Sequence, residues 1–336
     1  MEKTDINEFV EDMMDVIQKK YKELKTLNVM VLGKTGVGKS TLINNMFNEK
    51  IAETGVGKPI TQKIRKITKP NFPIAIYDTP GLELGGENAL GALLEEVTSE
   101  IDKGIKSGDI DKAIHCIWYC ISTPSHRFEQ AEIDFLKKFL GMTSEFDVPV
   151  IIVLTQSYSK NDAKSLTREI ERENLPVAKI VSVLAENYSI NGEYTVDAYG
   201  LDTLSEIMNS VIPEAVQKTF IAVQKTNLKL KKEKAQTIVA AAATAAAVTG
   251  ATPIPFSDAA ILAPGQAAML AGITATFGIP IEKGSITAIV SATIGTAGTT
   301  VLGKTIVSNL LKFIPVVGSV AGGVISATTA AALTAA

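Results

Sequence analysis

The 336-residue chain contains little cysteine and little histidine, with two residues of each. Cys116 and Cys120 lie in one apolar run, and their spacing fits neither a disulfide framework nor a metal site, so we expect buried reduced thiols. With only His115 and His126, a histidine-based metal site or a Ser-His-Asp triad is not expected. The net charge of −3 carries no nucleic-acid-binding signal. The charged N-terminus has no apolar segment, so no secretory signal is expected.

Charge is also scarce in the last third of the chain. Residues 1–217 carry 24 basic and 33 acidic side chains, residues 218–234 carry six lysines and one acid, and residues 235–336 carry five charges. This break predicts a basic connector over 218–234 and a hydrophobic helical domain over 235–336. Apolar residues at helical spacing predict an amphipathic helix within 1–25. We expect it to pack on the next domain (26–217), with partner binding as the alternative.

The hydrophobic tail holds four stretches without charge, close to the length that crosses a bilayer as helix. They are 235–257, 259–281, 284–303 and 313–336. The lysines just before them suit a cytoplasmic juxtamembrane segment. The tail is also rich in Ala, Gly and Thr and leaves little room for turns. We therefore expect membrane association at the cytoplasmic face, keep a soluble helical bundle as the alternative, and assign no individual spans.

One stretch in the main domain fits the pattern G-x-x-x-x-G-K-[ST] between a buried strand and a helix. The apolar run 27–32 precedes it, and a helix-compatible segment follows. In this arrangement backbone N–H groups and the helix N-terminus hold phosphate, the lysine reaches the β- and γ-phosphates, and the hydroxyl binds Mg²⁺. The predicted nucleotide-binding residues are Gly33, Lys34, Thr35, Gly36, Val37, Gly38, Lys39, Ser40 and Thr41.

Two segments downstream provide further ligands. A strand over 72–78 ends in Asp78-Thr-Pro-Gly81, which brings a carboxylate to the phosphate loop, where it can hold Mg²⁺. The Gly81 amide can meet the γ-phosphate. The polar loop 53–62 has the place of a nucleotide switch, and Thr61 is the candidate that offers a hydroxyl to Mg²⁺, with Thr54 and Thr68 as the alternatives. The predicted metal ligands are therefore Ser40, Thr61 and Asp78.

The remaining pattern alternates buried strands with helices. Strands are predicted over 64–68, 113–121, 148–154 and 177–184, helices over 89–105, 127–140 and 162–174, and a polar loop over 186–199. Such alternation is typical of an α/β fold with a doubly wound, mostly parallel sheet. The predicted fold is a P-loop NTPase domain of this kind, followed by an all-α hydrophobic C-terminal domain.

The motifs resemble those of the translation-factor-class P-loop GTPases of the Era-like kind, over roughly residues 26–215. The resemblance implies binding of GTP and GDP with Mg²⁺. It also implies a guanine-reading motif, Asn/Thr-Lys-x-Asp, after the strand 148–154. Here that position reads Thr155-Gln156-Ser157-Tyr158, without the lysine and the aspartate. Asp162 is a possible substitute, and Ala185 matches a fifth motif that supports the base. Thr155, Gln156 and Ala185 are therefore predicted contacts.

The resemblance implies slow hydrolysis of GTP to GDP and phosphate, with Lys39, Thr61 and the Gly81 amide as catalytic groups. Leu82 stands where some relatives carry a water-orienting glutamine, and Arg127 is a weak candidate for a charge donor in cis. The expected function is a switch whose mobile loops act on a membrane-associated helical domain, through self-association or an unidentified protein partner. Two alternatives remain: a nucleotide-binding membrane scaffold with vestigial hydrolysis, and an ATPase.

The tail has a resemblance of its own. Residues 252–260 (TPIPFSDAA), with Gln266-Ala-Ala-Met269 and Phe277-Gly278, are similar to the YcjF-type hydrophobic domain of unknown function, over about residues 235–325. The resemblance implies a helical, membrane-linked module and brings no chemistry.

Overall fold

The computed structural model describes residues 3–48, 50–52, 63–70, 72–81, 86–125, 130–248, 264–278, 284 and 287. The chain divides into two compact units, and each is described by itself. The first, called here the nucleotide unit, is Lys25–Asn227. The second, called the helical unit, joins Met1–Leu24 with Leu228–Ala336.

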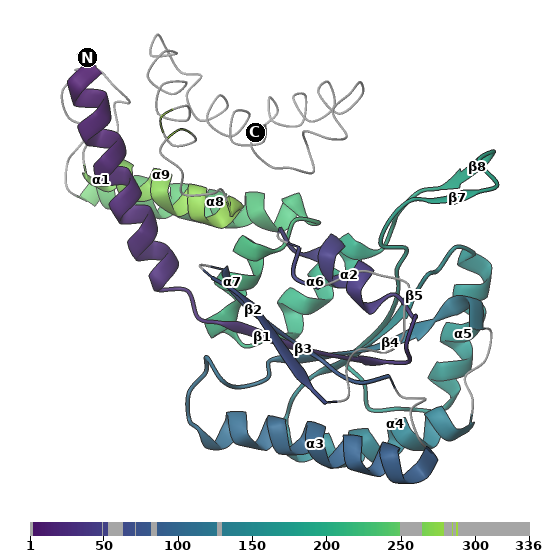
Figure 1. Cartoon of the computed structure of the whole chain (residues 1–336). Helices are drawn as coiled ribbons and strands as arrows, with labels where there is room; N and C mark the ends of the chain where they lie inside the picture. Colours follow the sequence, from purple (N-terminus) through teal and green to yellow (C-terminus); the bar gives the residue numbers. More distant parts are fainter. Residues whose placement is uncertain are drawn as a thin grey trace. The chain divides into compact units, whose positions relative to one another are not determined.

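The nucleotide unit is built on a six-stranded sheet with the order β2-β3-β1-β4-β5-β6 (Figure 1). All neighbouring strands are parallel except β2, which pairs antiparallel with β3 at one edge. The strands are β1 (Leu27–Gly33), β2 (Arg65–Lys69), β3 (Phe72–Asp78), β4 (Cys116–Ser122), β5 (Val150–Thr155) and β6 (Lys179–Ser182). The predicted doubly wound, mostly parallel sheet is confirmed.

Helices cover both faces of this sheet (Figure 1). On one face, α3, α4 and α5 cover Met30 and Leu32 of β1 in a continuous apolar core. On the other, Trp118 of β4 stacks on Phe47 with ring centroids 6.0 Å apart. Successive residues of a strand point to opposite faces, so these central strands read as unbroken apolar runs. The helices are α2 (Lys39–Met46), α3 (Gly86–Lys106), α4 (Gln130–Thr143), α5 (Lys160–Arg172), α6 (Leu201–Val211) and α7 (Glu214–Val223), with 3-10 turns at Thr123–Ser125 and Ser144–Phe146.

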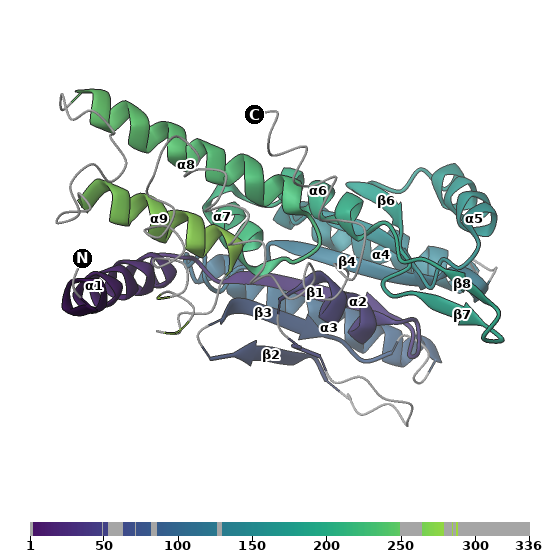
Figure 2. The same ribbon diagram turned by 90° about the horizontal axis from the view of Figure 1, so that it is seen from above.

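Two parts of the nucleotide unit differ from the sequence prediction. Residues 186–199, predicted as a loop, contain a hairpin of β7 (Tyr188–Ile190) and β8 (Tyr194–Val196). The hairpin extends from the unit in Figure 1 and is seen from above in Figure 2. The predicted connector 218–234 is divided between the units. Its first part continues α7, where Phe220 and Val223 are buried, because its apolar residues share one helix face between the lysines.

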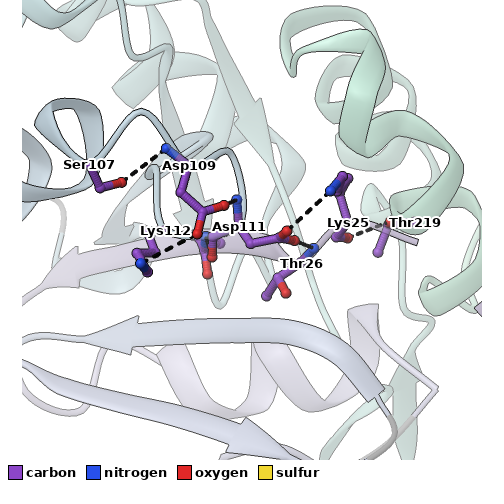
Figure 3. A network of polar contacts seen from close by, with 8 residues as sticks. Lys25, Thr26, Ser107, Asp109, Asp111, Lys112 and Thr219 are labelled. Carbon is purple, nitrogen blue, oxygen red and sulfur yellow. Dashed lines mark hydrogen bonds and ion pairs between the residues drawn. The ribbon is translucent and has the colours of Figure 1, made fainter. Parts of the chain in front are cut away.

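A polar network ties the entry of β1 to the loop before β4 (Figure 3). The Asp111 carboxylate accepts from the Thr26 amide and lies 3.4 Å from the Lys25 ammonium. Burial raises the pKa of Asp111, but these two partners outweigh it and hold the pKa below its usual value. The Thr219 hydroxyl donates to the Lys25 carbonyl at 2.6 Å, which adds α7 to the network. This network lies at the amino ends of the strands and leaves their carboxyl ends for a ligand.

The helical unit contains α1 (Lys3–Lys22), α8 (Leu228–Val248) and α9 (Pro264–Phe277). Helix α9 packs against both α1 and α8. Val10, Met13 and Ile17 of α1 are fully buried, as their spacing predicts. Most of the predicted stretch 284–303, all of the stretch 313–336 and most of the YcjF-type segment lie outside the described residues. Among the helices that are described, none is both long enough and apolar enough to span a bilayer.

Candidate nucleotide site

The loop between β1 and α2 follows a path that depends on glycine. Gly33 has φ +146°, and a Cβ atom there would lie 2.5 Å from the Cys120 carbonyl oxygen. Gly38 has φ +92° and is the N-cap residue of α2. Both conformations are in the region that residues with side chains rarely adopt. The chain therefore turns sharply at the end of β1, as the glycine spacing predicts.

The start of α2 presents its backbone amides to this loop. The first helical hydrogen bond runs from the Leu42 amide to the Gly38 carbonyl at 2.9 Å. The amides of Lys39, Ser40 and Thr41 precede it, so they have no acceptor within the helix. The Lys39 ammonium donates to the Gly33 carbonyl at 2.8 Å and to the Lys34 carbonyl at 3.0 Å. The loop thus gathers amide donors, a helix N-terminus and an ammonium, all of which favour an anion.

The predicted carboxylate lies beside this loop. Asp78 ends β3 and is paired in register with Val31 of β1, two residues before the loop begins. Burial raises the pKa of Asp78, while the charges of Lys39 and Arg65 oppose that rise. Thr79 is fixed by a hydrogen bond from its hydroxyl to the Val31 carbonyl at 3.1 Å. Gly81 is buried close behind. Thr61, Leu82 and Arg127 lie outside the described residues.

Thr155 and Gln156 brace the phosphate loop from the end of β5. The buried Thr155 hydroxyl donates to the carbonyls of Val37 and Ile121. The Gln156 side-chain amide donates to the Gly36 carbonyl at 3.0 Å, and its oxygen accepts from the Ser122 hydroxyl at 2.6 Å. Gln156, which stands where the resembled motif carries lysine, thereby links the loop to β4.

A second contact holds the loop from α4. The Lys34 ammonium lies 3.1 Å from the carboxylate of Glu132, whose side chain is only 5% exposed. The Tyr119 hydroxyl donates to the same carboxylate at 3.3 Å. Sequence reasoning missed this pair, because 98 positions separate the two residues and no motif links them.

A cleft opens next to the phosphate loop. Gly38, Thr41, Thr155, Gln156 and Ala185 line it, all of which were predicted. The structure adds residues that were not predicted as contacts: Leu42, Tyr158, Val183, Leu184, Glu186 and Tyr188. Asp162, the suggested substitute for the missing aspartate, is instead in the first turn of α5, where its amide donates to the Ser159 hydroxyl.

A match to a protein family model shows to which family the chain belongs. The model of the septin family matches residues 23–229, more than half of the sequence. The chain belongs to the septin family. It is a septin-type P-loop GTPase. This assignment corrects the Era-like subdivision that was predicted from the motifs. The septin match ends at residue 229, so the YcjF-type resemblance of the tail stays a prediction.

Individual septins and related proteins are distant. The chain is 26% identical over 216 residues to cell division control protein 10 of Candida albicans, covering 56% of each chain. It is 29% identical over 146 residues to human septin-9, covering 37% of this chain and 25% of that one. The chain therefore spans about half, or less, of the length of these curated relatives.

Solved structures with a similar fold include Era in complex with MgGDPNP and ribosomal RNA. That match has 21% identity, a TM-score of 0.40, and covers 57% of this chain and 58% of that one. Toc33 from Arabidopsis thaliana in complex with GDP and Mg²⁺ has 18% identity, a TM-score of 0.38, and coverage of 63% and 90%.

Proposed function

We propose that the chain binds GTP with Mg²⁺ and hydrolyses it slowly to GDP and inorganic phosphate. One observation carries the proposal: the open first turn of α2 and the Lys39 ammonium converge on one loop. A triphosphate would replace the Gly33 and Lys34 carbonyls as the acceptor of Lys39. Gly33, Lys34, Thr35, Gly36, Val37, Gly38, Lys39, Ser40 and Thr41 would surround the phosphates.

The residues present suit a magnesium ion beside the phosphates. Asp78 supplies a carboxylate beside Lys39, Ser40 supplies a hydroxyl at the start of α2, and Thr61 would supply a second hydroxyl. Oxygen ligands together with phosphate oxygens are what Mg²⁺ prefers. When bound, the ion neutralises charge on the phosphates.

Hydrolysis requires a water oxygen to attack the γ-phosphorus while the bond to the β–γ bridging oxygen breaks. Lys39 and the loop amides would stabilise the charge that develops on the phosphate oxygens. Gly81 would donate its amide to the γ-phosphate. We expect turnover of about 10⁻³ s⁻¹ or below, as for unassisted GTPases.

The first test compares nucleotide binding and phosphate release by the full chain and its Lys39→Ala variant. The loss of two charge-assisted contacts should weaken triphosphate binding roughly a hundredfold. The control is Lys50→Ala, which removes an exposed lysine further along the same segment and should change nothing. Equal affinity of wild type and Lys39→Ala would exclude this loop as the phosphate site.

We propose further that nucleotide turnover is coupled to the tail at the cytoplasmic face of a membrane, with self-association or a protein partner acting through the switch loops. The uneven charge of residues 218–336 supports this proposal. Flotation of the full chain with anionic liposomes tests it, and a chain that stays unbound favours the soluble bundle. If the chain binds liposomes and nucleotide but hydrolyses no GTP, the alternative function of a nucleotide-binding membrane scaffold is favoured.

A further inference from the structure

The base end of the cleft carries a carboxylate at an unexpected place. The fourth motif of the resembled family would put an aspartate at position 158, but this chain has Tyr158 there. Glu186, which directly follows Ala185, lines the same cleft. The two side chains are close enough that the Glu186 charge, after burial and Tyr188, helps to raise the pKa of Tyr158. The carboxylate of Glu186 therefore lies where a nucleotide base would be read.

Glu186 and Ala185 offer complementary hydrogen-bonding groups. Within the described residues, the Glu186 carboxylate makes no hydrogen bond or ion pair, and the Ala185 amide donates to no acceptor. A carboxylate accepts and an amide donates. Guanine presents N1–H and 2-amino donors beside its O6 acceptor, whereas adenine presents an amino donor in place of O6. The pair of groups therefore matches guanine and mismatches adenine.

Two tyrosines form an aromatic wall beside these groups. The rings of Tyr158 and Tyr188 have centroids 3.9 Å apart and planes inclined by 32°. Tyr158 is held by its amide, which donates to the Gln156 carbonyl at 2.7 Å, and the Tyr199 hydroxyl donates to the Ser157 carbonyl at 2.8 Å. Aromatic faces stack on any base without reading its edge. The wall would thus add affinity and leave discrimination to polar groups.

We infer that Glu186 discriminates the base of the bound nucleotide in favour of guanine, and that Tyr158 and Tyr188 form the wall against which the base packs. The inference rests on the proposed nucleotide site and names its specificity residues. In the resembled family the loop after β5 reads the base, and here the segment after β6 takes that role. Gln156 and Thr155 then act by bracing the phosphate loop.

The test is a competition assay in which GTP, ITP, XTP and ATP displace a fluorescent GTP analogue from the full chain. Wild type should prefer GTP, then ITP, which lacks the 2-amino group, then ATP. In Glu186→Gln the new amide can donate to the 2-oxo group of xanthine. This variant should lose roughly tenfold to a hundredfold in GTP affinity, gain XTP affinity, and keep its ATP affinity.

A matched control is Glu193→Gln, which removes the same charge from the turn of the hairpin that follows Glu186, at a residue that does not line the cleft. It should preserve the wild-type order. For the wall, Tyr188→Ala should weaken all four nucleotides by roughly tenfold. Tyr194→Ala, a 66% exposed tyrosine on β8, should weaken none.

The outcomes separate this inference from the proposed function. If Glu186→Gln keeps the wild-type preference for GTP, or loses GTP and ATP affinity equally, the role of Glu186 is overturned while the phosphate site stands. If the wild type binds all four nucleotides equally and Lys39→Ala abolishes this binding, base discrimination is overturned while the phosphate site stands. Absence of any nucleotide binding overturns both.

Discussion

The nucleotide unit and the helical unit each contain a lysine that donates to backbone carbonyls, with opposite consequences. Lys39 is partly exposed at an open loop and bonds the carbonyls of Gly33 and Lys34. Lys231 of α8 is fully buried and donates to the Phe277 carbonyl at the end of α9 at 3.0 Å. Burial lowers the pKa of Lys231 to about 7. In the function proposed above, the first lysine exchanges its acceptors for phosphate, whereas the second holds two helices together.

The largest expected effect concerns the loop that holds Lys39. Gly33→Ala places a Cβ 2.5 Å from the Cys120 carbonyl and imposes φ +146° on a residue with a side chain. We expect a destabilisation on the order of 3 kcal/mol and the loss of nucleotide binding. Thermal unfolding and nucleotide titration measure both.

The matched control is Gly36→Ala, in the same loop. Gly36 has φ +78°, but no atom lies within 4 Å of the position of the new Cβ. The substitution should therefore lower the free energy of unfolding by only about 1 kcal/mol. Similar losses of stability in Gly33→Ala and Gly36→Ala would show that backbone conformation, and not the close approach to Cys120, restricts position 33.

The second prediction concerns Lys231 and pH. The pKa of Lys231 is about 7 in the folded protein and near 10.5 when unfolded, so the unfolded state binds the extra proton between these values. The free energy of unfolding of the wild type should therefore rise with pH from 7 to 10, relative to Lys231→Met. The expected slope is at most on the order of 1 kcal/mol per pH unit.

Urea unfolding of both proteins at several pH values measures this difference. Lys229→Met, which changes an exposed lysine of the same helix, should follow the wild type. Parallel profiles for wild type and Lys231→Met would show that Lys231 does not change its protonation on folding in this range.

The smallest predicted effect concerns the contact between the phosphate loop and α4. Glu132→Gln removes the charge that faces Lys34 and should reduce stability by about 1–2 kcal/mol and GTP affinity severalfold. The control, Glu173→Gln, breaks the more exposed pair with Lys137 and should cost less than about 1 kcal/mol with no change in affinity. Unchanged GTP affinity in Glu132→Gln would mean that Lys34 is positioned without its partner.

Most of the sheet could be predicted from the sequence because local patterns determine it. The buried strands are mostly apolar runs, and the phosphate loop and Asp78 stand at the ends of two of them, β1 and β3. The hairpin at 186–199 was missed because its strands have three residues each and expose Tyr188 and Tyr194, which leaves little apolar alternation to detect.

The sequence by itself determined the order of strands and helices, the phosphate loop and the carboxylate at the end of β3, because each depends on residues adjacent in the chain. Only the tertiary structure decided which distant residues meet. Tyr158 contacts Tyr188, Lys34 faces Glu132, and α1 packs against α9, which lies far along the chain. Such contacts depend on how buried faces pack, and packing joins residues that no local spacing relates.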